Sequence, residues 1–394
     1  MRKVVVGLVL GDGSAPEGMA QACAIAIKAA RKDGIKLVFE KIAAGWAAFN
    51  EFGDTLPAKS LKRATELGLL FFGGVGEKAL DDTIGKQHPE MLPEGRCLLT
   101  FRDEWQLLVN ERPAIYHPEL RSIAKVRESS IPDKGINQCW LRFLLEDSYY
   151  GNRHFIKKIN PEAVEIIGLK LKDKVTGEES VVSDLAYYTI EKVTEFFRYA
   201  FTRARGLHVP LICVDKKNVL ARYVFWRKIA TKIHEQEFSD VEMRCHYSDD
   251  TTRLLFNPAL LDGVIACGNE HGDMLSDGAL EAVGSMGLMY SSAKNLKTGQ
   301  ALFESGAGTF PEAKGKNITN PIGRIMAGSL LDEHIGALNG ARAIEQAVLR
   351  VLKEGYRTPD LCGNKKDPYA LASPGWGDKV LGTKEMGELI LSYL

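Results

Sequence analysis

The chain has 394 residues, 45% of them apolar and 26% charged, which is typical of a folded globular protein with room for two domains. Lys plus Arg and Asp plus Glu both total 51, so the net charge is zero and we expect no nucleic-acid partner. No apolar run reaches membrane-spanning length, and the seven cysteines are scattered without a CxxC pair, so we expect a reduced, cytoplasmic protein without membrane association.

The N-terminal part alternates between strand-like and helix-like segments, which is typical of an α/β sheet with helices on its faces. The loop after the first strand lacks the GxGxxG spacing, so we do not expect a standard Rossmann domain. The apolar patterns predict strands over 3–10, 37–41 and 69–74, and helices over 16–31 and 102–110.

The regular alternation of strand-like and helix-like segments is interrupted in the middle of the chain. Residues 114–185 contain short β-prone pieces between charged turns, and we interpret them as a protruding hairpin or arm. The alternation then resumes, with helices predicted over 184–205 and 218–233, strands over 211–214 and 264–267, and further helices over 326–352 and 383–394.

Asp273 and Asp277 form the most informative pair in the chain. They follow the apolar run 260–267, so the helix that carries them would open at the carboxyl end of a strand, where α/β proteins bind ligands. Two carboxylates one turn apart repel each other unless a cation such as Mg²⁺ or Mn²⁺ lies between them. A solvated helix face would show the same spacing. Asp249 follows another strand-like run and offers a third carboxylate for a partly hydrated ion.

Other residue types suit an anionic substrate beside such an ion. Arg102, Arg112 and Arg142 suit a dicarboxylate, because a guanidinium binds a carboxylate with two parallel hydrogen bonds, although each arginine alone would be an ordinary surface residue. Tyr149 and Lys216 would make an acid and base pair, since a cation lowers neighbouring pKa values.

Taken in order, these motifs resemble the β-decarboxylating dehydrogenases: isopropylmalate, isocitrate, homoisocitrate and tartrate/D-malate dehydrogenases. The matching pieces run from Gly11-Asp12-Gly13 to the C-terminus and include 215–220, 272–277 and 315–321. The resemblance implies an isocitrate/isopropylmalate dehydrogenase-like α/β fold with three layers and two lobes. It implies a discontinuous cofactor-binding domain, residues 1–107 and 285–394, and a dimerisation and substrate/metal domain, residues 108–284, with an arm at about 152–183 that clasps the partner.

The resemblance also implies how the reacting groups divide between two subunits of a homodimer. Lys216, the base that takes the hydroxyl proton, would come from the partner subunit together with Asp249. Asp249 would complete a metal site with Asp273 and Asp277, and Tyr149 would protonate the enol after CO₂ leaves.

For substrate binding, the resemblance implies that Arg102, Arg112 and Arg142 clamp the carboxylates and that Asn218 contacts substrate and nicotinamide. The substrate-selecting stretch holds conflicting signals. Leu98 and Leu99 would form an apolar wall as in isopropylmalate enzymes, whereas Arg96 could meet a third carboxylate as isocitrate-type substrates require. The pieces 101–110 and 315–318 resemble the tartrate/D-malate branch, so the substrate stays open.

The dinucleotide would lie on residues 304–320. Glu312 stands where NAD-using relatives carry an acid, which can accept hydrogen bonds from both ribose hydroxyls and repels a 2′-phosphate, so we expect NAD and not NADP. Asn320 resembles the adenine contact. Backbone of the glycine-rich loops would approach the cofactor at Gly74, Gly308 and Thr309.

We therefore expect NAD- and Mg²⁺- or Mn²⁺-dependent oxidative decarboxylation of a small 2-hydroxy dicarboxylate of the 3-isopropylmalate or D-malate/tartrate class. One alternative is an isocitrate, homoisocitrate or specialised-metabolite dehydrogenase. A second alternative is a non-catalytic regulatory homologue, because Ala307 stands where family members carry a His that contacts adenosine.

Overall fold

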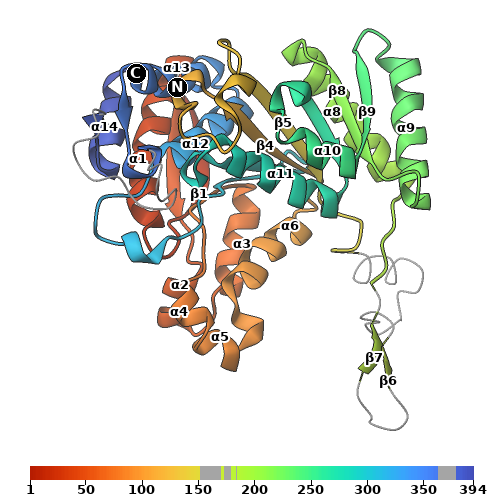
Figure 1. Ribbon diagram of the computed structural model, residues 1–394. Coiled ribbons are helices and arrows are strands. Elements are labelled where there is room, and N and C mark those ends of the chain that lie inside the picture. The colour runs from red at the N-terminus through yellow and green to blue at the C-terminus, as the bar shows by residue number, and fades with distance from the viewer. Residues whose placement is uncertain (151–169, 173–178, 183, 363–378) are drawn as a thin grey trace. The chain divides into compact units, whose positions relative to one another are not determined.

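The computed structural model describes residues 1–150, 170–172, 179–182, 184–362 and 379–394 (Figure 1). They form two compact units: unit 1 comprises residues 1–107, 111–136 and 279–394, and unit 2 comprises residues 108–110 and 137–278. The segment 111–136 lies in unit 1, whereas residues 108–284 are predicted as one domain. Within unit 1, strand β4 (Val109–Tyr116) pairs with β11 (Tyr290–Lys294). The functions assigned to the two domains stay predictions.

Unit 1 is built on a mixed sheet with strand order β2-β1-β3-β12-β11-β4. Strand β1 pairs in parallel with β2 and β3, β12 pairs in parallel with β3, and β11 is antiparallel to β12. The other strands of this sheet are β1 (Arg2–Val9), β2 (Ile35–Lys41), β3 (Leu69–Phe72) and β12 (Ala301–Ser305). Strand β3 is an unbroken apolar run, because helices and loops cover both faces of a parallel strand.

Four helices pack together beside this sheet, namely α1 (Ala15–Ala30), α12 (Ile322–His334), α13 (Leu338–Lys353) and α14 (Thr383–Ser392) (Figure 1). Small side chains let them approach closely: an added Cβ at Gly340 of α13 would lie 2.7 Å from the carbonyl oxygen of Ala29 on α1. The shorter elements are α2 (Trp46–Phe52), α3 (Ala58–Leu67), α4 (Lys78–Asp81), α5 (Ile84–Gln87), α6 (Thr100–Glu104), β13 (Tyr356–Arg357) and β14 (Lys379–Val380).

Unit 2 contains the parallel strand order β5-β10-β8-β9, bounded as β5 (Ile136–Phe143), β10 (Gly263–Cys267), β8 (Leu211–Asp215) and β9 (Met243–Tyr247). Its helices are α8 (Ile190–Leu207), α9 (Ala221–Glu237), α10 (Ser248–Leu254) and α11 (Asn269–Val283). Aromatic rings fill the space between α8, α9 and the sheet: Trp226 is fully buried, with its ring centroid 4.6 Å from that of Phe197 and 5.6 Å from that of Phe143.

The predicted arm is described only in part. Strands β6 (Lys170–Lys172) and β7 (Glu179–Val182) pair antiparallel, as a hairpin requires. The other residues of the stretch 152–182 lie outside the described part of the chain, as does residue 183. The extension of the arm over 114–185 is wrong for β5, because Trp140, Leu141 and Phe143 of that strand are buried in the core of unit 2.

Three of the predicted helices differ from the structure in how they begin, end or divide, beyond small shifts of their bounds. The helix over 102–110 is wrong beyond Glu104, because the apolar run 107–109 enters the buried strand β4, which also contains Pro113. The helix predicted from 184 begins at Ile190, where the Thr189 side chain caps it. The helix over 326–352 divides into α12 and α13 around Gly336, whose φ of 84° ends a helix.

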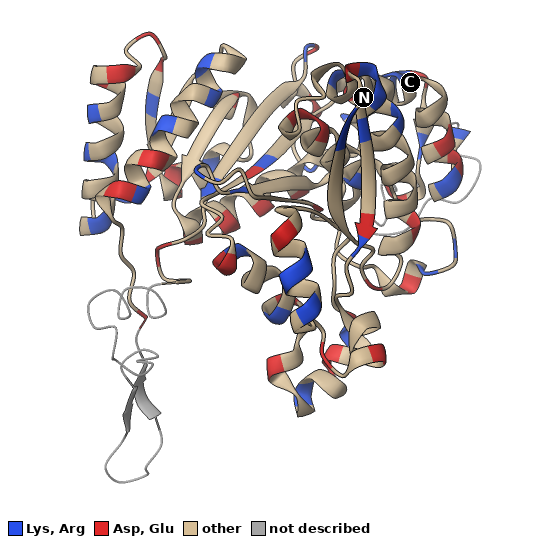
Figure 2. Ribbon diagram, turned by 180° about the vertical axis from the view of Figure 1, so that it is seen from behind, with Lys and Arg blue, Asp and Glu red and all other residues tan. Residues whose placement is uncertain are grey.

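The surface carries charged side chains of both signs, in keeping with the zero net charge of the sequence. Figure 2 shows Lys and Arg interspersed with Asp and Glu along the helices of each unit, with neither sign dominant. None of the helices in the described ranges combines the length and apolarity needed to cross a membrane.

Asp332 of α12 provides a test of this packing. Its side chain is fully buried, and neither carboxylate oxygen has a hydrogen-bond partner among the described residues. Burial, reinforced by Asp33, raises the pKa of Asp332 from its ordinary value of 3.8 to about 8. Between these pH values the folded protein holds a proton that the unfolded chain has released, so stability falls as pH rises through this window.

We therefore expect Asp332→Asn to raise the free energy of unfolding at about pH 8 by about 1–3 kcal/mol, and by much less at about pH 5. Urea unfolding at the two pH values measures this difference. An equal change at both values would show that Asp332 does not carry the proton.

Candidate active site

The parallel register of unit 2 determines where its polar residues gather. Arg142 and Cys267 are paired across β5 and β10, and Asp215 and Tyr247 are paired across β8 and β9. The four strands therefore end at one edge of the sheet, which is where open α/β sheets bind ligands. The predicted site residues of this unit follow these strand ends: Arg142, Tyr149, Lys216, Asn218, Asp249, Asp273 and Asp277.

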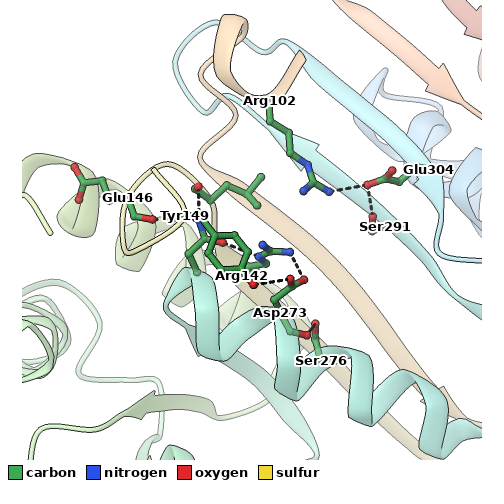
Figure 3. Close-up of polar contacts among 10 residues, drawn as sticks. Arg102, Arg142, Glu146, Tyr149, Asp273, Ser276, Ser291 and Glu304 are labelled. Atoms are coloured by element: carbon green, nitrogen blue, oxygen red, sulfur yellow. Dashed lines mark hydrogen bonds and ion pairs between the residues drawn. The ribbon is translucent and has the colours of Figure 1, made fainter. Parts of the chain in front are cut away.

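Arg142 is the buried centre of this edge. Its Nε donates to Asn269 Oδ1 at 2.8 Å, and its Nη1 forms an ion pair with Asp273 (Figure 3). Asn269 is itself fixed, because its amide donates to the carbonyl oxygens of Leu144 and Glu146 at 2.6 and 3.1 Å. An added Cβ at Gly272 would lie 3.1 Å from Arg142 Cγ, so the glycine lets α11 pass close over the arginine. The structure thus brings Arg142 and Asp273 together, and their roles stay predictions.

Tyr149 also faces this pair. Its hydroxyl donates to Asp273 Oδ2 at 3.2 Å, and its ring centroid lies 5.2 Å from Arg142 Cζ (Figure 3). Partial burial and the Asp273 carboxylate raise the pKa of Tyr149, although nearly half of the residue is exposed. A protonated, accessible hydroxyl at this position is a suitable proton donor.

A buried network supports the loop that carries Tyr149, and sequence reasoning missed it. Asp147 has a φ of 74° and is fully buried; it accepts a hydrogen bond from the Tyr188 hydroxyl at 2.6 Å and pairs with Arg222 at 3.2 Å. Gly268, between β10 and α11, also faces this network and has no room for a side chain, because an added Cβ would lie 2.2 Å from Tyr188 Oη and 2.7 Å from Tyr223 Oη. The network therefore holds the Tyr149 loop against the start of α11.

Lys216 and Asp249 form a second pair at the ends of β8 and β9. The Lys216 ammonium lies 2.5 Å from Asp249 Oδ1, and this hydrogen bond lowers the pKa of Asp249. Asp215, just before the lysine, is fully buried and forms an ion pair with Arg227, which fixes the strand end. Asn218 lies exposed in the following turn.

The three predicted metal ligands do not gather within the described part of one chain, where no group of three His, Cys, Asp or Glu side chains could hold a metal ion. Asp273 is half-buried and Asp277 is exposed one turn further along α11, while Asp249 pairs with Lys216. Carboxylate oxygens are nevertheless the donors that Mg²⁺ and Mn²⁺ prefer. The donor set fits such an ion if a second chain supplies the missing acid.

The arginines of unit 1 have partners of their own. Arg102 on α6 is buried; its Nη2 lies 3.2 Å from Glu304 on β12, whereas its Nε has no hydrogen-bond partner among the described residues (Figure 3). Ser291 Oγ donates to the same Glu304 oxygen at 3.3 Å. Arg112 lies half-buried on β4. A buried guanidinium with an unmet donor is suited to an anionic ligand.

The stretch predicted to select the substrate forms a six-residue π-helix, Glu94–Leu99, a rare form that often occurs at functional sites. Leu98 and Leu99 are half-buried. Arg96 is engaged within unit 1, because its Nη2 lies 3.1 Å from Asp54 and 3.2 Å from the carbonyl oxygen of Leu56.

The two loops predicted to approach the cofactor, those of Gly74 and of Gly308 and Thr309, meet the first loop of the chain at the carboxyl ends of β1, β3 and β12. An added Cβ at Gly11 would lie 2.1 Å from the carbonyl oxygen of Gly74, and one at Gly13 would lie 2.5 Å from that of Thr309. Asp12 accepts hydrogen bonds from the backbone amides of Trp46, Ala47 and Gly76 at 2.9–3.2 Å. The first loop is thus a backbone-binding turn and not a GxGxxG loop.

Further along this region, the Gly308 carbonyl accepts a hydrogen bond from the buried Arg324 at 2.8 Å. Glu312 is exposed. Asn320 is buried and has a structural role, because its amide donates to Asp360 at 3.0 Å and its oxygen accepts from the Ile322 amide at 2.9 Å, at the start of α12. If Asn320 contacts adenine, its side-chain amide must do so while it keeps the hydrogen bonds to Asp360 and Ile322.

Comparison with known proteins places this geometry in a family. A family model described as isocitrate/isopropylmalate dehydrogenase matches residues 5–390. The chain belongs to this family. The resemblance inferred from the motifs, the α/β fold class and the assignment as a decarboxylating dehydrogenase are thereby confirmed.

Relatives of known name match along nearly the whole chain. A protein named 3-isopropylmalate dehydrogenase from Photorhabdus laumondii is 32% identical over 391 residues, which cover 99% of this chain and 97% of the relative. Another of that name, from Helicobacter hepaticus, is 30% identical and covers 98% of both chains.

Solved structures agree with the fold. Isocitrate dehydrogenase from Methylococcus capsulatus superposes with a TM-score of 0.73 at 26% identity, over 100% of this chain and 99% of that chain. An apo β-decarboxylating dehydrogenase from Thermococcus kodakarensis gives a TM-score of 0.69 at 26% identity, over 100% and 96% of the two chains.

Gly268 tests the network that supports Tyr149. We expect Gly268→Ala to lower the free energy of unfolding by about 1–3 kcal/mol, because the new methyl group overlaps two tyrosine hydroxyls. Gly278→Ala is the matched control, since its Cβ would meet only Leu255 Cδ1, at 3.1 Å, and we expect a change within about 1 kcal/mol. Urea unfolding of both variants measures the difference, and equal midpoints would contradict the packing described.

Proposed function

We propose that the protein catalyses NAD- and Mg²⁺- or Mn²⁺-dependent oxidative decarboxylation of a malate-type 2-hydroxy dicarboxylate, with 3-isopropylmalate as the first candidate substrate. The observation that carries this proposal is the arrangement of Arg142, Tyr149 and Asp273 beside one strand end, with the Lys216–Asp249 pair at the same sheet edge. Each group is of the chemical type that the reaction needs.

The side chains divide the work as follows. Arg142, Arg102 and Arg112 bind carboxylates of the substrate, and Lys216 takes the proton of the hydroxyl group as a ketone forms. Tyr149 then gives its proton to the carbon from which CO₂ has left. The raised pKa of Tyr149 keeps this proton on the phenol near neutral pH.

The described residues include side chains and loops suited to hold the metal ion and NAD. Asp273 and Asp277, with Asp249 of a second subunit, would hold the metal ion, and the loops at Gly74, Gly308, Thr309 and Glu312 would hold NAD. When bound, the ion polarises the substrate oxygen and stabilises negative charge there, while NAD accepts the hydride. Because Lys216 and Asp249 are paired, one subunit of a homodimer would supply both residues to the active site of the other.

The name borne by the relatives supports 3-isopropylmalate, and the half-buried Leu98 and Leu99 are compatible with its branched apolar group. The engagement of Arg96 by Asp54 makes it a poorer ligand for a third carboxylate, which disfavours an isocitrate-type substrate. The D-malate/tartrate class stays as the second candidate, because the motif resemblance extends to it.

A substrate screen tests the proposal. We expect NADH formation with Mn²⁺ present from at least one of 3-isopropylmalate, D-malate and tartrate, with slower turnover of isocitrate and homoisocitrate and weaker use of NADP. Absorbance at the NADH band measures each rate. No turnover of any of the five acids with either dinucleotide would contradict the proposed activity.

The metal role predicts a difference between two neighbouring acids of α10. We expect Asp249→Asn to raise the Mn²⁺ concentration for half-maximal activity by about tenfold or more, because a carboxylate ligand is lost. Asp250→Asn is the matched control, since Asp250 pairs with Arg253 at 2.7 Å and with His246 at 3.1 Å. Titration of activity with Mn²⁺ separates the two, and an equal effect of both substitutions would remove Asp249 from the metal site.

A further inference from the structure

Two cysteines face each other across the last two strands of unit 2. Cys213 of β8 and Cys245 of β9 are paired residues in a parallel ladder, so their side chains lie on the same face of the sheet. Neighbouring strands lie about 4.8 Å apart, which falls within the Cα separations of roughly 4.4–6.8 Å that disulfides span. Both cysteines are free thiols.

The two thiols have complementary surroundings. Cys245 is exposed, whereas Cys213 is fully buried. The neighbouring Cys213 thiol, followed by Arg227 and Lys217, lowers the pKa of Cys245 to about 7, against the effect of partial burial. Burial instead raises the pKa values of Cys23 and Cys97 to about 12. Cys245 is thus an exposed thiol that is partly ionised near neutral pH, with a second thiol beside it on the neighbouring strand.

We propose that Cys245 and Cys213 form a redox-modification site, in which Cys245 reacts with a small peroxide and Cys213 resolves the product to a disulfide between β8 and β9. In the first step the Cys245 thiolate attacks one peroxide oxygen; a sulfur–oxygen bond forms, the oxygen–oxygen bond breaks, and hydroxide leaves to become water. In the second step Cys213 sulfur attacks Cys245 sulfur; the sulfur–sulfur bond forms, and the oxygen leaves as water with the Cys213 proton. Two electrons pass from the two thiols to the peroxide.

The same two strands carry the Lys216–Asp249 pair. Asp215 and Tyr247 follow the cysteines by two residues on β8 and β9, with Lys216 one residue beyond Asp215 and Asp249 two residues beyond Tyr247. A covalent bond draws the paired Cβ atoms to about 3.8 Å, closer than the ladder requires, and so changes the strand ends. Oxidation is therefore expected to lower activity reversibly, and this regulatory consequence rests on the function proposed above.

The chemistry is tested on the full-length protein in its native assembly, independently of activity. The reduced protein is treated with hydrogen peroxide at pH 7, and its peptides are analysed by mass spectrometry before and after reduction with dithiothreitol. We expect a Cys213–Cys245 disulfide that dithiothreitol reverses, and alkylation of Cys245 at least about tenfold faster than that of Cys23. A Cys245 thiol no more reactive than Cys23, or oxidation that stops at sulfinic acid without a disulfide, would overturn the proposal.

Variants separate the site from its consequence. Cys245→Ser, at an exposed position, should abolish the disulfide and leave activity insensitive to peroxide, whereas Cys23→Ser should keep both the disulfide and the sensitivity. A disulfide that forms without any loss of turnover would overturn the regulatory part alone. A protein that turns over no malate-type acid would sink the proposed function while the disulfide result stands.

Discussion

The parallel pairing of β5, β10, β8 and β9 is the constraint on which the candidate site depends. Side chains separated by more than a hundred residues, such as Arg142 and Asp273, meet because their strands end at one edge in a fixed register. A change of one residue in that register would turn the side chains of a strand to the opposite face. The chemistry assigned to this edge is therefore inseparable from the fold of unit 2.

Two ion pairs lie at the same edge of the sheet. Asp273 faces Arg142 and Asp249 faces Lys216, so each of these acids already has a cationic partner within its own chain. Such pairs orient the two carboxylates at the edge where we propose that a divalent ion and an anionic substrate bind. The described residues of one chain contain no group of three His, Cys, Asp or Glu side chains that could hold a metal ion, so the proposed metal site needs a second subunit.

Much of this arrangement follows from the sequence, because apolar runs ending in Gly or Asp are strong local signals. The strand before Asp273, its helix and the lysine after β8 are all as predicted. The residues that sequence reasoning missed contact partners that are distant in the sequence. They are Glu304 beside Arg102, Asn269 beside Arg142, and the buried Asp147. No local pattern marks such partners, because only the folded chain brings them together. The helix predicted over 102–110 failed for a related reason, since a short apolar run is compatible with either a strand or a helix until its neighbours are known.

The central claim is that two subunits share one catalytic centre, and mixing inactive variants tests it most directly. Lys216→Ala and Asp273→Asn homodimers should each be inactive, and subunit exchange between them should restore about a quarter of the wild-type activity, because each hybrid dimer regains one intact site. If the mixture stays inactive although hybrid dimers are detected by native mass spectrometry, Lys216 and Asp273 do not serve a site built from two chains, and the account is contradicted.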